Sequence, residues 1–260
     1  MTGAVLIETH ERTRVLTINR PEARNALTPE ALALLSQAFD DASADPSLRC
    51  VVLTGASGHF CAGADLRAAQ IDDPEFADRI EASIDAFHGL VRRLVRCDKP
   101  TVAMMDGAAV GFGADLSFAC DLRVASTRAY AQEKFVKIGL MPDGGGTFWL
   151  PRLVGTARAM QAILLAQPLD ADTLLRLGVV AAVVPPEQLT ETTMALAREL
   201  ASGPPLSFAA IKRTMLASWG SFEDALARER DEQIKLLRSA DVVEGVRAWA
   251  EKRAPRFEGR

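Results

Sequence analysis

The chain of 260 residues has few of the side chains that build metal centres and disulfide frameworks. It contains three histidines and four scattered cysteines, and no two cysteines form a C-x-x-C pair. Zinc sites take their ligands from closely spaced cysteines and histidines, so no metal site is expected. The cysteines stand among apolar residues, which is typical of reduced, buried thiols. Reduced thiols indicate a cytoplasmic protein.

Long apolar runs and an excess of one charge are also missing. No stretch reaches the roughly 20 apolar residues of a membrane span. The first fourteen residues carry Glu8, Glu11 and Arg12 in place of the apolar core of a signal peptide. The net charge of −4 gives no electrostatic attraction to nucleic acid. We therefore expect neither a membrane nor a nucleic acid as a partner.

The first half of the chain alternates between strand and helix patterns. Apolar and β-branched runs predict strands at 15–18, 51–54, 101–105 and 121–125. One helix has Thr28 as its cap and Pro29 in its first turn. A longer amphipathic helix follows Pro74 and ends before Lys99-Pro100, where proline disfavours continuation. This order of elements predicts an α/β core.

The second half is dominated by helical periodicity. The predicted helices cover 156–166, 170–177, 186–202, 206–219, 222–239 and 242–253, with one strand at 179–184. The clearest break is Ser202-Gly203-Pro204-Pro205. We therefore expect a core domain over residues 1–200 and a helical domain over 201–260. The last helices either close over the core or pack against another subunit.

Two glycine-rich turns, each following a strand and expected to lead into a helix, are the candidate sites. Residues 58–66 read GHFCAGADL and residues 106–115 read DGAAVGFGAD. Small residues let a ligand approach the backbone, and a helix start leaves N–H groups unpaired. Either sequence alone is most often just a tight turn. A dinucleotide fingerprint is incomplete because residue 116 is leucine, and Gly144-Gly145-Gly146 lacks the lysine of a P-loop.

Both turns belong to a set of motifs that covers nearly the whole chain. The others are NRPEARNAL (19–27), Lys99-Pro100, GLMPDGGGT (139–147) and EKRAPRF (251–257). Together they resemble the crotonase, or enoyl-CoA hydratase/isomerase, superfamily. The resemblance implies an α/β fold made of a spiral of strand-strand-helix (ββα) units with a helical C-terminal domain, assembled as a trimer or hexamer. It also implies an acyl-coenzyme A thioester as substrate, with no cofactor beyond the coenzyme A of that substrate.

The resemblance assigns the thioester carbonyl oxygen to two backbone N–H groups, here those of Ala64 and Phe112. Fixed amide dipoles stabilise the charge that gathers on this oxygen when the α-carbon loses a proton. Phe112 stands where glycine is usual in the family, so we expect its side chain to narrow the pocket. The remaining substrate-binding residues implied are those along coenzyme A, with Ala62 near the adenine and two arginines near the phosphates: Arg24, Ala62, Asp65, Leu66 and Arg67.

The groups that handle the proton decide the reaction. Hydratases of the family use two glutamates; here Asp115 stands at the first position and Phe135 at the second, so one carboxylate is lost. Glu133 is expected to share a face with Phe135 in an extended strand. Residues 135–145 resemble the isomerase branch that includes phenylacetate-pathway enzymes, in which an aspartate at the position of Asp143 moves a proton between two carbons. One carboxylate suffices for such a shift, as base and then acid.

These residues leave three functions open. The favoured interpretation is an enoyl-CoA isomerase acting through Asp143. The first alternative is an enoyl-CoA hydratase that uses Asp115, helped by Glu133, and the second is a non-catalytic acyl-CoA-binding protein. Each aspartate also has a structural alternative, Asp143 as a helix cap and Asp115 as a first-turn carboxylate at a helix N-terminus. The sequence indicates neither the acyl group nor the pathway.

Overall fold

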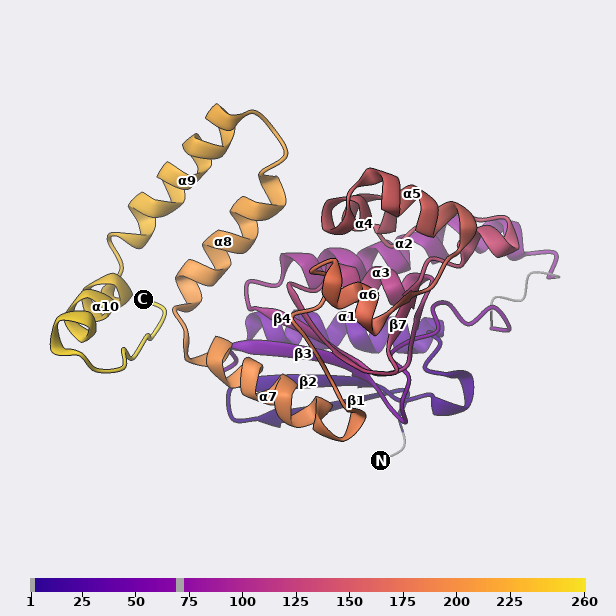
Figure 1. The fold of residues 1–260 in the computed structure, drawn as a ribbon, viewed down its shortest axis with the longest axis horizontal. Helices are drawn as coiled ribbons and strands as arrows, with labels where there is room; N and C mark the ends of the chain where they lie inside the picture. The colour runs from indigo at the N-terminus through magenta and orange to yellow at the C-terminus, as the bar shows by residue number, and fades with distance from the viewer. Residues whose placement is uncertain (1–2, 69–72) are drawn as a thin grey trace.

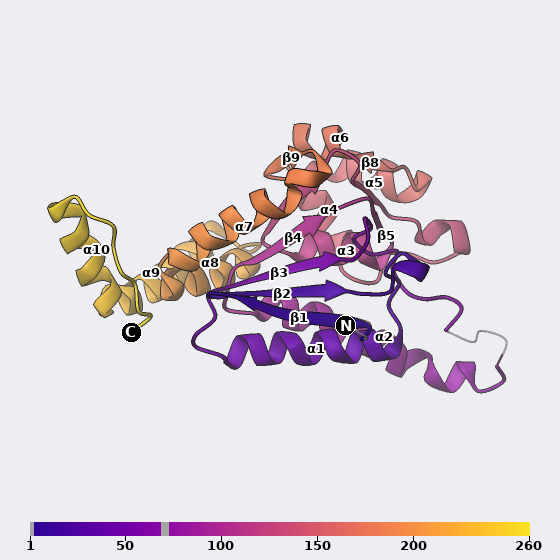
Figure 2. The ribbon, with the colours of Figure 1, turned by 90° about the horizontal axis from the view of Figure 1, so that it is seen from below.

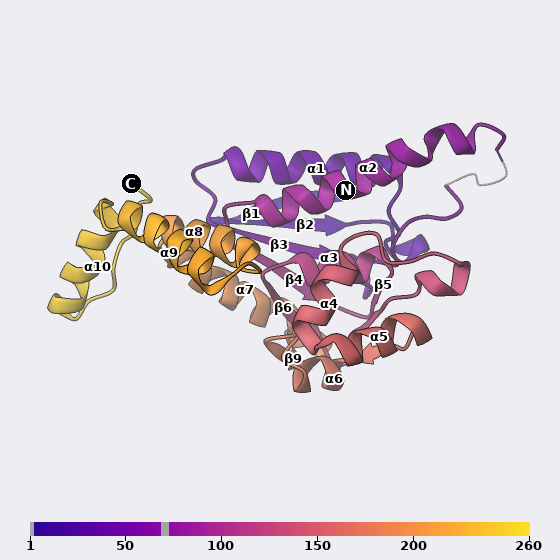
Figure 3. The ribbon, with the colours of Figure 1, turned by 90° about the horizontal axis from the view of Figure 1, so that it is seen from above.

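The computed structural model describes residues 3–68 and 73–260 (Figure 1). It is built on a six-stranded sheet in the order β1-β2-β3-β4-β6-β9 (Figure 3). The first strand pairs antiparallel with the second, and every later pairing is parallel. The strands are β1 (Val5–His10), β2 (Thr13–Ile18), β3 (Cys50–Gly55), β4 (Thr101–Met105), β6 (Leu122–Ser126) and β9 (Ala182–Val184). The strands predicted at 15–18, 51–54, 101–105 and 121–125 are confirmed, with bounds that shift by at most two residues.

Helices cover both faces of this sheet. Two helices, α1 (Pro29–Ala44) and α2 (Phe76–Arg96), run side by side along one face (Figure 3). As predicted, Thr28 caps α1, because its Oγ1 accepts the N–H of Ala31 at 3.2 Å. On the other face, α7 (Pro186–Ser202) packs on side chains that include Val15, Val52 and Val102. Alternate residues of each strand therefore enter two separate cores.

A second, small sheet lies beside the main one and carries the start of α3 (Phe112–Ala119). Its strands are β5 (Ala108–Val110), β7 (Tyr130–Gln132) and β8 (Leu169–Asp170), in the order β5-β7-β8. β5 pairs parallel with β7, and one residue, Gly111, separates β5 from α3. All eight residues of α3 are buried. The structure also has two 3₁₀ helices, η1 (Pro21–Ala23) and η2 (Phe135–Ile138).

The later helices follow the predicted order. Three of them, α4 (Gly146–Val154), α5 (Thr156–Leu165) and α6 (Ala171–Arg176), precede α7. The predicted strand at 179–184 is shortened to 182–184, because the N–H groups of Val179 and Val180 donate to Leu174 O and close α6 instead. After Gly203, the chain continues as α8 (Pro205–Ala217), α9 (Phe222–Leu236) and α10 (Ala240–Glu251). These three helices extend away from the sheet (Figures 1 and 2).

The helix expected directly after the first glycine-rich turn does not begin there. Residues 66–68 form a turn in which Asp65 Oδ1 accepts the N–H of Arg67 at 3.1 Å and of Ala68 at 3.4 Å. Residues 69–72 lie outside the described part of the chain, and α2 starts at Phe76. In the described residues, no helix has the length and apolar character needed to cross a membrane.

Candidate functional site

A cavity of about 310 Å³ lies where the two glycine-rich turns meet. Its wall combines backbone of residues 62–64 and 110–112 with apolar side chains, two lysines (Lys134 and Lys137) and a single acidic residue. The lining includes the side chains of Leu66, Phe87, Phe112, Phe135, Leu140 and Asp143. A mostly apolar cavity with a few polar groups is the usual form of a small-molecule site.

Backbone hydrogen bonds hold the first turn between two other segments. On one side, Val110 donates its N–H to Cys61 O at 2.9 Å. On the other side, Leu27 donates to Gly63 O at 2.8 Å, and Asp65 donates to Leu27 O at 2.9 Å. Between these bonds, the N–H of Ala64 meets no backbone acceptor within residues 3–68 and 73–260. That N–H therefore stays available at the cavity wall.

Close packing of the two turns requires glycine at residue 63. Gly63 has φ +91°, and an added Cβ would lie 2.8 Å from Val110 O and 3.3 Å from Phe112 N. Phe112 is the first residue of α3, where an N–H has no partner within the helix. Ala64 and Phe112 thus bring free N–H groups to neighbouring parts of one cavity wall.

The Phe112 side chain is 1% exposed and packs edge-on against Phe87, with ring centroids 4.6 Å apart. Phe135 approaches from the next segment, its ring 3.7 Å from where a Cβ on Gly111 would stand. Aromatic rings from α2, α3 and η2 therefore surround the space beside the two N–H groups.

Asp143 is the acidic residue of the cavity wall, and it is half-buried. Burial raises the pKa of its carboxyl, and the nearby His88 opposes part of that rise. Asp143 does not cap the helix that follows it, since the residue at the cap of α4 is Gly145 and no side chain makes a capping hydrogen bond there. The structural alternative of a helix cap is therefore wrong.

Asp115 and Glu133 lie behind this wall, 0% and 2% exposed. The expectation that Glu133 shares a face with Phe135 is wrong, because β7 ends at Gln132 and the chain turns into η2 at Phe135. Because of this turn, the Phe135 side chain lies in the cavity wall, and the Glu133 side chain lies beside Asp115. Asp115 does not serve the N–H groups of its own helix; its Oδ2 accepts the N–H of Gly144 at 2.8 Å.

The residues expected along coenzyme A fall into two groups. Ala62, Ala64 and Leu66 line the cavity, and Arg24 and Arg67 are exposed and outside the lining. Asp65 has a structural role, since its carboxylate pairs with Arg20 at 2.8 Å and accepts the N–H groups of the turn after it.

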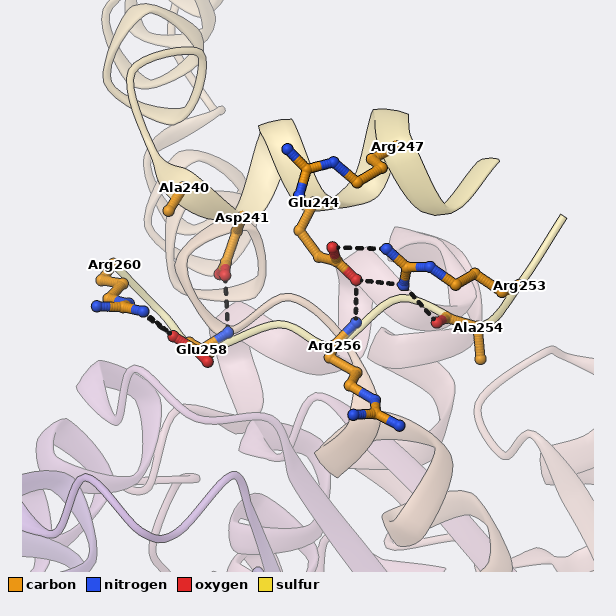
Figure 4. A pocket seen from close by; sticks show the side chains of 9 residues that line it. All are labelled: Ala240, Asp241, Glu244, Arg247, Arg253, Ala254, Arg256, Glu258 and Arg260. Carbon is orange, nitrogen blue, oxygen red and sulfur yellow. Dashed lines mark hydrogen bonds and ion pairs between the residues drawn. The ribbon is translucent and has the colours of Figure 1, made fainter. Parts of the chain in front are cut away.

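A larger cavity of about 700 Å³ lies under the C-terminal tail, with many charged side chains (Figure 4). Glu244 binds the guanidinium of Arg253 through both carboxylate oxygens, at 2.6 and 2.9 Å. Asp241 accepts the N–H of Glu258 at 2.7 Å. Most of this charge is used to hold the tail against α10. In the part of the chain that the structure describes, no cluster of His, Cys, Asp and Glu could hold a metal ion.

Residues 8–260 match the family model of enoyl-CoA hydratase/isomerase. The chain belongs to the enoyl-CoA hydratase/isomerase family. Among its relatives, the 1,2-epoxyphenylacetyl-CoA isomerase of Escherichia coli is 38% identical over 258 residues, 98% of both chains. A probable enoyl-CoA hydratase of Rhodobacter capsulatus is 38% identical over 254 residues, 97% of both chains.

Solved structures of enoyl-CoA hydratases have the same fold. That of Bacillus anthracis superposes with a TM-score of 0.94 at 26% identity, covering 99% of this chain and all of the other. That of Polaromonas sp. JS666 has a TM-score of 0.93 at 33% identity, over 98% and 100% of the two chains. The crotonase fold and family expected from the sequence are confirmed. Members of the enoyl-CoA hydratase/isomerase family act on acyl-CoA thioesters, but the relatives include both isomerases and hydratases.

Proposed function

We propose that this chain is an enoyl-CoA isomerase in which Asp143 carries a proton from one carbon of the acyl chain to another. The observation that supports this choice is the distribution of acids around the cavity. Asp143 belongs to the wall, whereas Asp115 and Glu133 are almost completely buried behind it. A hydratase of this family needs carboxylates that reach a water molecule beside the substrate.

The backbone N–H groups of Ala64 and Phe112 are the proposed donors to the thioester oxygen. Both residues line the cavity, and neither N–H is used by the surrounding secondary structure of the described residues. The N-terminus of α3 adds the positive end of a helix dipole at the same place. Loss of one such donor typically costs about 2.7–4 kcal/mol of transition-state stabilisation.

The proposed reaction converts a 3-enoyl thioester into a 2-enoyl thioester. The Asp143 carboxylate removes a proton from the α-carbon, and the electron pair of that C–H bond moves onto the thioester oxygen to form a dienolate. The resulting carboxylic acid then gives the proton to the γ-carbon, and the double bond moves into conjugation. A raised pKa suits this group, because it must hold the proton between the two steps.

The test is the conversion of 3-enoyl-CoA to 2-enoyl-CoA by Asp143→Asn. We expect kcat to fall by roughly 100-fold or more, the usual range for a lost general acid–base. Asp172→Asn, an exposed position on α6, is the matched control and should keep the wild-type rate. Since the pKa of Asp143 is raised from 3.8, wild-type activity should rise with pH through a value above 3.8. An unchanged rate in Asp143→Asn contradicts the proposal.

A second candidate is an enoyl-CoA hydratase acting through Asp115, because hydratases are also among the relatives at 38% identity. Water addition to 2-enoyl-CoA by the same variants distinguishes the two. Loss of hydration in Asp115→Asn with full activity in Asp143→Asn supports the hydratase. Tight acyl-CoA binding without turnover of either substrate supports a non-catalytic binding protein.

We further propose a homo-oligomer, a trimer or a hexamer, held together by α8–α10. Large apolar side chains on these helices face solvent: Trp249 is 82% exposed, Phe222 73% and Val246 63%. Large apolar side chains exposed on neighbouring helices are typical of surfaces that another subunit covers. Arg24 and Arg67, exposed guanidinium groups on segments next to the cavity, are proposed to bind the phosphates of coenzyme A.

A further inference from the structure

Two buried carboxyl groups take no part in the reaction proposed above. Asp115 lies in the first turn of α3, and Glu133 follows β7. The charged group that acts on both is another acid, Asp143, and His88 of α2 in turn lowers the pKa of Asp143 through its charge. In the described residues, neither carboxyl is in an ion pair with lysine or arginine. Burying a charge without such a partner is costly, so the pair must keep at least one proton.

Asp115 is bonded directly to the turn that carries Asp143. Its Oδ2 accepts the N–H of Gly144, the residue after Asp143, at 2.8 Å. Pro142, the residue before Asp143, has no N–H to anchor that side of the turn. A Cβ on Gly144 would stand 2.6 Å from Asp115 Cβ and 2.7 Å from Phe112 Cδ2. The turn therefore lies directly on the Asp115 side chain.

Protonated Glu133 can satisfy the other oxygen of Asp115, in addition to the backbone N–H of Gly146, which also favours the Asp115 carboxylate. Asp115 Oδ1 and both oxygens of Glu133 are buried without a donor. A Cβ on Gly146 would collide with Asp115 Oδ1 and with Glu133 Oε1, so the two carboxyl groups meet beneath Gly146. Burial raises the pKa of both groups, and the charge of Asp115 raises that of Glu133 further. Glu133 is therefore the partner that keeps the proton.

We propose that Asp115 and Glu133 are positioning residues: protonated Glu133 donates a hydrogen bond to Asp115, and Asp115 holds residues 142–146 so that Asp143 faces the cavity. This inference rests on the isomerase role proposed for Asp143. Loss of the shared proton leaves two buried charges that repel each other and also face Asp143. The turn then moves, and the proton carrier is displaced from the substrate.

Steady-state kinetics of 3-enoyl-CoA isomerisation across a range of pH tests the proposal. Asp115→Ala removes the acceptor of the Gly144 N–H, so kcat should fall by roughly 10- to 100-fold, the effect of a misplacement of about 1 Å. KM should change by less than about 3-fold, because the N–H groups that bind the thioester and the apolar lining are unchanged, and Asp143 acts in the chemical step. Asp41→Ala, an exposed position on α1, is the control and should leave both constants unchanged.

Glu133→Gln distinguishes a proton shared between Glu133 and Asp115 from a purely steric role of the Glu133 side chain. Glutamine has the same size and a permanent N–H donor for Asp115, so kcat near neutral pH should stay within about 3-fold. The wild type should lose kcat at alkaline pH, and Glu133→Gln should lack this alkaline limb while it keeps the acid limb of Asp143. The exposed control Glu30→Gln should keep both limbs. Asp115→Asn, which preserves the side-chain volume, should also abolish the alkaline limb.

An alkaline limb in Glu133→Gln equal to that of the wild type overturns the proposal. So does wild-type kcat in a folded Asp115→Ala protein in which Asp143→Asn is inactive. Infrared spectroscopy gives a readout that needs no substrate: a protonated carboxylic acid band near neutral pH, lost in Glu133→Gln. Absence of this band in the wild type also overturns the shared proton. If Asp143→Asn keeps full activity, the isomerase mechanism fails and the infrared result alone decides the pair.

Discussion

Replacing Arg123 with methionine removes a buried cation that binds backbone carbonyls only. Arg123 is 7% exposed, and its Nε donates to Val179 O at 2.6 Å. Its other nitrogens donate to the carbonyls of Ser117, Phe118, Cys120 and Asp121. Two of these carbonyls belong to the last turn of α3, where carbonyl groups lack intrahelical partners and the helix dipole is negative. Arg123 thus completes the far end of the helix whose first residue is Phe112.

The expected cost follows from what methionine leaves behind. It fills a similar volume with apolar atoms, so the main loss is that of donors to buried carbonyls. Each buried polar group left unsatisfied costs about 1–3 kcal/mol. Because three carbonyls share one nitrogen of Arg123, we count the loss over the three donor nitrogens and expect the free energy of unfolding to fall by at least about 3 kcal/mol. This is a large part of the roughly 5–15 kcal/mol that stabilises a typical domain.

Urea unfolding followed by circular dichroism measures this loss. Arg123→Lys keeps the charge but not the planar fork of donors, so it should lie between the wild type and Arg123→Met. Arg158→Met, at an exposed position on α5, is the matched control and should change stability by less than about 0.5 kcal/mol. A loss below about 1 kcal/mol in Arg123→Met refutes the view that this side chain supports α3.

Two further changes test the cavity wall and the outer helices. Gly63→Ala should weaken acyl-CoA binding and destabilise the fold, since the added Cβ would lie 2.8 Å from Val110 O. Calorimetry measures the binding, and urea unfolding measures the stability. Gly155→Ala, also at positive φ but in open space, is the control for backbone strain. Val246→Glu on α10 should shift the mass measured by light scattering from an oligomer to a monomer. Met160→Glu, at another exposed apolar position on α5, should not. A monomeric wild type would contradict the proposed oligomer.

Elements with strong local signals could be predicted from the sequence. The strand at 101–105 and the helix at 186–202 have the predicted bounds, because a buried parallel strand is apolar throughout and a helix between prolines and glycine has clear ends. β1 was missed, since five of its six residues are not fully buried and the edge strand lacks a clear alternation. β5, β7 and β8 are three residues or shorter, and their pairing depends on distant segments.

The candidate site also has parts that could be predicted from the sequence and parts that could not. The glycine-rich turns could be predicted because the close approach at Gly63 leaves a local signature in small residues. The burial of Asp115 and Glu133 could not, because it depends on how α3, the segment after β7 and the 142–146 turn pack together. A change from strand to 3₁₀ helix between Gln132 and Phe135 decides which side chain reaches the cavity. The spacing of residues in the sequence does not predict this change from strand to 3₁₀ helix.

Backbone N–H donors and side-chain proton carriers respond differently to substitution. A backbone donor at residue 112 needs only the backbone path from Gly111 into α3, so phenylalanine can replace the glycine usual in the family without removing the N–H. A proton carrier, in contrast, acts only if its side chain reaches the substrate. The same pair of backbone N–H donors can therefore serve several reactions. Which of these reactions takes place depends on the acids that line the cavity. Here one carboxyl lines it and two are buried behind it, and this partition is why we favour a proton shift over the addition of water.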